Sequence, residues 1–95
     1  MFIVNLFYKK PISEIEKHIK AHRDFLDIHY QSGYFLASGA KNPRNGGIIL
    51  VNSQISRDHL EQILLEDPFR QNDIADYEII EFVPSKYASI LADNI

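Results

Sequence analysis

The order in which strand-like and helix-like hydrophobic patterns follow one another constrains this chain most. A strand pattern precedes a long amphipathic helix pattern, then come two strand patterns, a shorter helix pattern and a last strand. This β-α-β-β-α-β order predicts an α+β fold, a ferredoxin-like sandwich whose four-stranded antiparallel sheet carries two helices on one face. The expected segments are residues 2–8, 13–31, 34–40, 48–52, 56–66 and 77–83.

Local signals predict where the first helix begins and ends. Ser13 and Glu16 fit a capping box, with Ser13 as the N-cap. Gly33 is placed to follow the last turn in the left-handed conformation that often ends a helix. In the preceding strand the even positions from Phe2 to Tyr8 are all apolar, so we expect the even face to pack against the helices.

The second half of the chain contains weaker local signals. Pro68 disfavours helical geometry at Asp67, so we expect a turn to begin there. Residues 70–76 are polar and are expected to be irregular, whereas residues 87–93 fit a short terminal helix that would dock through Ile90 and Leu91.

The face of the sheet opposite the helices needs a cover. Its apolar side chains would otherwise form a patch larger than monomers usually expose. Pairing of two sheets in a homodimer is the simplest cover, and we predict it. The residues expected on this face are Ile3, Phe7, Ile48 or Ile49, and Ile79 or Ile80.

Composition narrows the class of partner. The 95 residues fit a single domain, 1–95, with a net charge of −3 and no cationic block longer than Lys9-Lys10. Nucleic acid is therefore not expected as a partner, because binding phosphate backbones needs clustered cations. We expect no membrane segment, because the apolar N-terminal stretch is too short, and no signal peptide, because this stretch lacks a basic n-region and a small-residue cleavage site. The absence of cysteine fits a cytoplasmic protein.

His22 and Asp67 form the strongest candidate for chemistry. His22 lies on the apolar stripe of the first helix, and Asp67 follows the second helix. If the helices lie side by side, a carboxylate there would orient one ring nitrogen and leave the other for general acid/base work. The alternative for His22 is a satisfied, partly buried core residue, and for Asp67 a turn residue that binds nearby backbone N–H groups.

Other chemical interpretations are weaker. His18 and His22 have a spacing that can grip a metal, but a third ligand is missing and no metal or other cofactor is expected. Ser38 has no obvious base except His22, which makes nucleophilic catalysis a weak hypothesis. The loop 42–47 is a hairpin connection rather than a phosphate-binding loop, since no helix follows it.

Several segments in order resemble the YCII-related, or YciI-like, family. They are Ala21-His22-Arg23-Asp24-Phe25-Leu26, Ser32-Gly33-Tyr34-Phe35-Leu36-Ala37-Ser38-Gly39, Glu66-Asp67-Pro68-Phe69 and Tyr77-Glu78-Ile79. The resemblance implies a dimeric α+β barrel, two ferredoxin-like units joined through their sheets. One departure is that Gly39 is followed by Ala40, where the family often has Gly-Pro.

The resemblance also implies a site and a reaction type. His22 and Asp67 would be the active-site pair, and Ser38, Gly39 and Phe69 would line the pocket. By analogy with structural relatives, the reaction would be proton transfer or elimination, of lyase or isomerase type, on a small cyclic or aromatic-derived compound. The alternative hypothesis is a non-catalytic small-ligand-binding or structural dimer.

Overall fold

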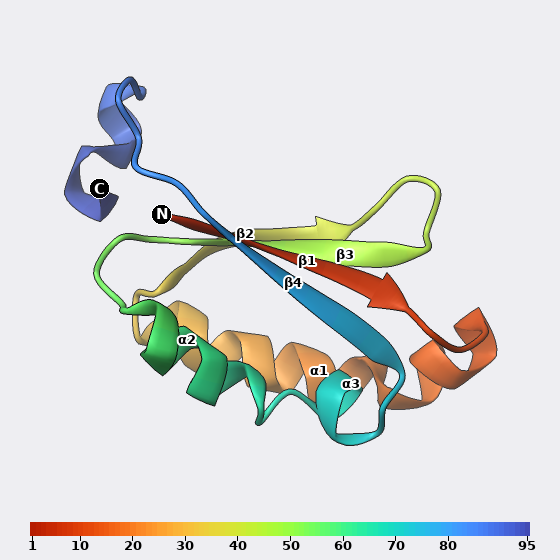
Figure 1. The fold of residues 1–95 in the computed structure, drawn as a ribbon. Helices are drawn as coiled ribbons and strands as arrows, with labels where there is room; N and C mark the ends of the chain where they lie inside the picture. Colours follow the sequence, from red (N-terminus) through yellow and green to blue (C-terminus); the bar gives the residue numbers. More distant parts are fainter.

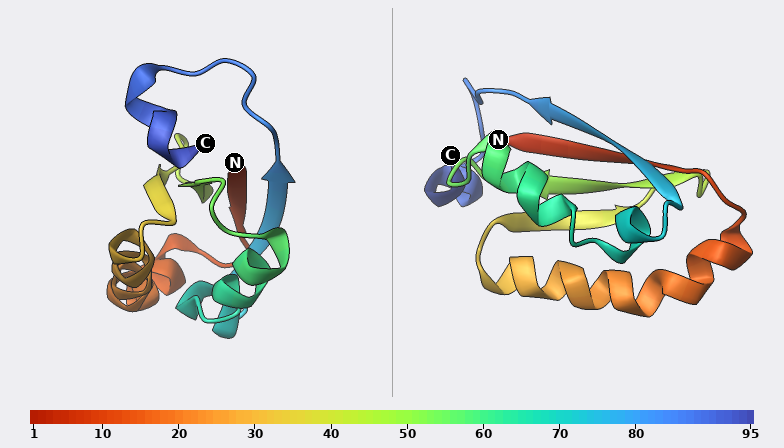
Figure 2. Two further views of the ribbon diagram at one scale, coloured as in Figure 1. Left: turned by 90° about the vertical axis from the view of Figure 1, so that its left-hand side faces the viewer. Right: turned by 60° about the horizontal axis from the view of Figure 1, so that its bottom comes forward.

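The three α-helices of the fold lie on one face of its sheet (Figures 1 and 2). A computed structural model describes residues 1–95. Every strand pair is antiparallel and the spatial order is β2-β3-β1-β4. The predicted α+β, ferredoxin-like fold is therefore confirmed. The elements are β1 (Phe2–Tyr8), α1 (Ile12–Gln31), β2 (Phe35–Ala40), β3 (Gly46–Val51), α2 (Arg57–Leu64), α3 (Pro68–Gln71) and β4 (Ala75–Glu81).

The central strand β1 divides the molecule into a helix-bearing face and an outer face. Phe2, Val4 and Leu6 are buried in the core, while Phe7 points to the outer face and is exposed. Successive side chains alternate across a strand, so this pattern confirms the prediction that the even positions face the helices.

Helix α1 begins two residues earlier than the capping-box pattern indicates. Its N-cap is Pro11, which forms no side-chain cap, and the Pro11 carbonyl accepts a hydrogen bond from the Glu14 N–H at 2.9 Å. Ser13 therefore lies inside the first turn, and its prediction as N-cap was wrong. At the other end Gly33 adopts a φ of +84° just beyond the last turn, as predicted.

A short helix that the hydrophobic pattern did not predict connects α2 to β4. Helix α2 is capped by Ser56, whose hydroxyl accepts from the His59 N–H at 3.1 Å. Helix α3 follows and extends to Gln71, and β4 already begins at Ala75, so the expectation of irregular structure over 70–76 was wrong at both ends. A helix of 4 residues is too short to show a periodic pattern.

The outer face of the sheet carries no α-helix, and its side chains are a mixture of apolar residues with polar ones such as Asn5 and Glu78. Strand register places Ile3 between Leu50 and Ile80, and it places Ile48 beside Asn5. Ile48 and Ile80 are therefore the outer-face members of the two alternatives left open by the sequence, while their neighbours Ile49 and Ile79 pack on the helix side.

The C-terminal segment forms a 3-10 helix, Ser89–Asn94, near the end of the sheet where the N-terminus lies (Figures 1 and 2). It is held by polar contacts: the Gln54 side chain donates to the Asp93 carbonyl at 2.6 Å, and the Ser53 N–H donates to the Asn94 carbonyl at 3.1 Å. Ile90 is 86% exposed, so the expectation that it docks was wrong. None of the helices combines the length and hydrophobicity needed to span a membrane.

Candidate functional site

Asp67 is held in place by the backbone that surrounds it. Its φ and ψ of −67° and 124° are extended, as the residue before proline prefers, and Pro68 occupies the first turn of α3. The Asp67 side chain then caps this helix, because its Oδ1 accepts the Phe69 N–H at 3.0 Å. The sequence Asp-Pro-Phe therefore fixes a carboxylate that is completely buried.

His22 reaches the same carboxylate from α1. Helix α3 packs against α1, and His22 Nδ1 lies 2.8 Å from Asp67 Oδ1. The imidazole also stacks on the Phe69 ring, with centroids 3.9 Å apart and planes inclined by 2°. The hydrogen bond and the stacking together set both the position and the rotation of the ring.

The acceptor role of Asp67 assigns the tautomer of His22. The carboxylate receives hydrogen bonds from the Phe69 N–H and from the Tyr77 hydroxyl, in addition to its contact with His22. An ionised carboxylate only accepts, so Nδ1 of His22 carries the proton that it donates to Asp67. In the neutral ring the remaining nitrogen, Nε2, is then an acceptor.

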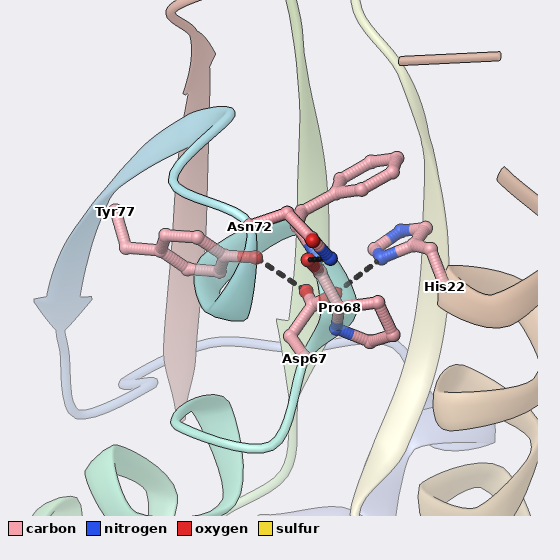
Figure 3. A network of polar contacts seen from close by, with 6 residues as sticks. His22, Asp67, Pro68, Asn72 and Tyr77 are labelled. Carbon is pink, nitrogen blue, oxygen red and sulfur yellow. Dashed lines mark hydrogen bonds and ion pairs between the residues drawn. The ribbon is translucent and has the colours of Figure 1, made fainter. Parts of the chain in front are cut away.

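Tyr77 supports Asp67 from the opposite side. Figure 3 shows the carboxylate between His22 of α1 and Tyr77 of β4, whose hydroxyl donates to Asp67 Oδ2. Burial raises the pKa of the Tyr77 phenol, and the negative charge of Asp67 raises it further. Tyr77 therefore stays protonated and remains a donor to the carboxylate.

A cavity of about 370 Å³ opens beside His22. It lies between α1 and the strands β2 and β3, and most of its lining is apolar, including Ile19, Leu26 and Ile49. His22 Nε2 makes no hydrogen bond within the protein, and it is not among the enclosed polar atoms that lack a partner. A ligand in the cavity would therefore meet a base whose other nitrogen is already bound.

The structure brings the residues singled out from the sequence into two layers. His22, Ser38, Gly39 and Phe69 line the cavity, whereas Asp67 lies behind His22 and does not line it. A ligand in the cavity would therefore meet the imidazole of His22 and not the Asp67 carboxylate.

Ser38 and Gly39 differ in detail from what the sequence suggested. The Ser38 hydroxyl is hydrogen bonded to the Tyr30 hydroxyl at 2.6 Å rather than to His22. A glycine inside a strand often marks a bulge or a close approach by another group, but the bulge of β2 lies between Phe35 and Ala37. A Cβ at Gly39 would meet no atom within 4 Å, so no group approaches this glycine closely.

Three contributors to the site were not identified from the sequence. Tyr30 follows His22 by two helical turns and lines the same cavity, a spacing that could have revealed it. Tyr77 and Arg44 come from β4 and from the β2–β3 loop. Neither has a local pattern that indicates its place, because each depends on how distant segments are aligned.

The metal-binding interpretation gains no support from geometry. No three His, Cys, Asp or Glu side chains converge in an arrangement that could hold a metal ion. His18, the proposed partner of His22 in such a site, does not line the cavity.

Comparison with known proteins places this architecture in a family. The family model of the YCII-related domain matches residues 1–83, which include every strand and the helices α1 to α3. No curated protein and no solved structure matches the chain.

Proposed function

The chain belongs to the YCII-related family, and we propose that it is a small enzyme of lyase or isomerase type in which His22 transfers protons. The observation that carries this proposal is the arrangement around one imidazole. Its Nδ1 is bound to Asp67, and its Nε2 has no protein partner beside the cavity. This is the arrangement that general acid/base catalysis by histidine requires.

The proposed reaction begins with proton abstraction at carbon. Nε2 of His22 takes a proton from a C–H bond that an adjacent unsaturated group has made acidic, and the electron pair stays on the substrate. The imidazolium formed is stabilised by Asp67, which accepts from Nδ1 and is itself held by Tyr77 and the Phe69 N–H. In an isomerisation the proton then returns at another atom of the substrate. In an elimination the electron pair forms a double bond, the leaving group departs with its own bonding pair, and the imidazolium releases the proton to it or to water.

The cavity supports a small substrate with a ring. Its volume of about 370 Å³ is at the lower end of ligand pockets, and its lining is mainly apolar. The stacked pair of Phe69 and His22 offers a flat surface. These properties favour a small cyclic or aromatic-derived compound, as the family resemblance implies.

We also propose that the protein forms a homodimer through its outer sheet face and works in the cytoplasm without nucleic acid or membrane as a partner. Phe7, Ile48 and Ile80 are 45%, 36% and 44% exposed and lie on neighbouring strands. Covering these exposed apolar side chains with a second copy removes them from water. Sedimentation of the wild-type protein and of Ile80→Glu tests this: a monomeric wild type would contradict the proposal.

The test of proton transfer does not need the natural substrate. Unsaturated cyclic lactones and hydroxylated, halogenated aromatic compounds are incubated with the protein in D2O, and deuterium incorporation at carbon is followed by NMR. Wild-type protein should accelerate exchange for at least one compound class. His22→Gln and Asp67→Asn should reduce the acceleration by about a hundredfold or more.

His18→Gln is the matched control, because His18 is on the same helix but outside the cavity. It should exchange at the wild-type rate. Exchange that is equally fast in wild type, His22→Gln and Asp67→Asn would contradict the proposed roles.

The second candidate function is a non-catalytic ligand-binding or structural dimer. One observation favours it: Asp67 also caps α3 and accepts from Tyr77, so its contacts stabilise the fold without any chemistry. Ligand-dependent stabilisation without any His22-dependent exchange would support binding alone.

A further inference from the structure

We propose that the cavity selects a carboxylate-bearing ligand whose anionic group binds Arg44. This inference rests on the proposed function, because it names the substrate class of the same site. It comes from the distribution of charge along the cavity rather than from the His22 pair itself.

The charged groups that line the cavity are unevenly distributed along its length, which runs beside α1. Arg44 comes from the β2–β3 loop and is paired with Glu16, near the beginning of α1, at 2.5 Å. Tyr30 is near the end of α1, and with a rise of about 1.5 Å per residue it is roughly 20 Å along the axis from Glu16. His22 lies between these two positions, so Arg44 and the Tyr30 hydroxyl line opposite ends of one cavity.

The other ionisable groups of the lining strengthen this polarity. Arg23 follows His22 and adds a second cation, whereas Asp27 lies closer to Tyr30 and adds a carboxylate. Arg44 and Arg23 therefore attract an anion, although the Glu16 carboxylate paired with Arg44 offsets part of this attraction, and Asp27 repels the anion from the Tyr30 end. The Tyr30 and Ser38 hydroxyls, bound to each other at 2.6 Å, offer only uncharged hydrogen bonds at that far end.

The ion pair with Glu16 does not use up the guanidinium. Nη1 of Arg44 contacts Glu16, which does not line the cavity, and the Tyr8 hydroxyl, which does, lies beside the same guanidinium. A guanidinium has five N–H donors arranged in a planar fork that matches a carboxylate. Donors therefore remain for a ligand, and the Arg44 side chain is still 39% exposed.

Binding of a substrate carboxylate to Arg44 would suit proton abstraction by His22. A carboxylate fixed on Arg44 would hold a small ring over the apolar wall, with an inner carbon near Nε2 of His22. Holding the substrate in one orientation relative to the base makes proton transfer more efficient.

Salicylate and its neutral analogue salicylamide test the proposal, because they differ in the charged group and share the ring and hydroxyl. Binding to the full-length protein is followed by NMR titration, with the His22 imidazole signals as reporter of the cavity. Wild-type protein should bind salicylate at least tenfold more tightly than salicylamide. Arg44→Gln should weaken salicylate binding by about tenfold to a hundredfold and leave salicylamide binding unchanged.

Two further variants separate a specific anchor from a general charge effect. Arg57→Gln removes the same charge from α2, outside this cavity, and should bind salicylate like wild type. Glu16→Gln releases Arg44 from its competing partner and should bind salicylate as tightly as wild type or more tightly.

Equal affinity of wild type and Arg44→Gln for salicylate would overturn the proposal, and so would the absence of any binding up to the solubility limit. The failure of this proposal can be told apart from the failure of the proton-transfer proposal. Arg44-dependent binding of salicylate without His22-dependent exchange would contradict proton transfer and support the carboxylate site. Exchange that requires His22 but does not depend on Arg44 would support proton transfer and contradict the carboxylate site.

Discussion

Two buried histidines on α1 are alike in burial and in aromatic packing, but only one of them has a polar partner. His22 and His29 are 9% and 7% exposed and lie on the same side of the helix. Each is packed against phenylalanine rings, His22 on Phe69 and His29 on Phe25. His22, however, has a carboxylate partner, whereas neither ring nitrogen of His29 has any partner.

Burial alone therefore does not mark a histidine as part of a site, whereas a hydrogen-bonding partner and an adjacent cavity do. His29 packs between Phe25 and Phe35, with centroid distances of 4.9 Å and 5.2 Å, and it does not line the cavity. Burial lowers the pKa of His29, because the charged imidazolium loses its hydration there. His29 is thus a neutral core residue, and His22 is bound on one nitrogen and open on the other.

Removing the carboxylate acceptor that only His22 has should have the largest effect on the stability of the protein. Asp67→Ala leaves three buried donors without an acceptor: the His22 Nδ1–H, the Phe69 N–H and the Tyr77 hydroxyl. We expect the free energy of unfolding to fall by about 3–5 kcal/mol, measured by urea denaturation.

Asp24→Ala is the control for this substitution, since Asp24 is an exposed residue of α1 paired with Lys20. It should unfold at nearly the wild-type urea concentration. A similar, small effect for both variants would show that Asp67 contributes little to the fold and that the contacts around it are weak.

The same substitution at the two histidines should have opposite effects on stability. His22→Phe keeps a ring stacked on Phe69 but removes a donor from the buried carboxylate, so we expect a loss of about 1–3 kcal/mol. His29→Phe keeps the aromatic contacts and removes two unpartnered nitrogens, so we expect a gain of about 1 kcal/mol. Denaturation of both variants under one set of conditions measures the difference, and a change of equal size and sign would refute it.

The pairing of His22 with Asp67 could be predicted because it follows from the order of whole elements. Two helices on one face of a small sheet bring the end of the second close to the middle of the first. The beginning of α1 is harder to predict than this pairing. Ser13 and Glu16 fit a capping box, but Pro11, whose ring fixes its φ, is the N-cap in the structure. Single-turn signals compete with one another, and tertiary packing decides between them.

The remaining site residues depend on alignment that the sequence does not encode locally. Tyr77 reaches Asp67 only because β4 pairs with β1 in a register that places Tyr77 beside Leu6. A shift of one residue would turn it to the outer face. Arg44 likewise lies in a loop whose path, rather than its composition, brings it to the cavity.

The smallest effect we predict is the response of His29 to acid. Because the folded-state pKa of His29 is lowered from 6.5, the unfolded chain takes up a proton at higher pH than the folded protein does. The contribution of His29 to stability is therefore complete above about pH 6.5 and is lost as the pH falls towards the lowered value. Glu66 opposes this lowering of the pKa and His59 adds to it.

Wild-type protein should thus lose stability on acidification more steeply than His29→Phe, by at most about 1.4 kcal/mol per pH unit. Urea denaturation between about pH 7 and pH 5 isolates His29 as the difference between the two proteins, since their carboxylates are identical. Parallel pH profiles would mean that His29 is hydrated in the folded protein, and the contrast with His22 would then be one of partner alone.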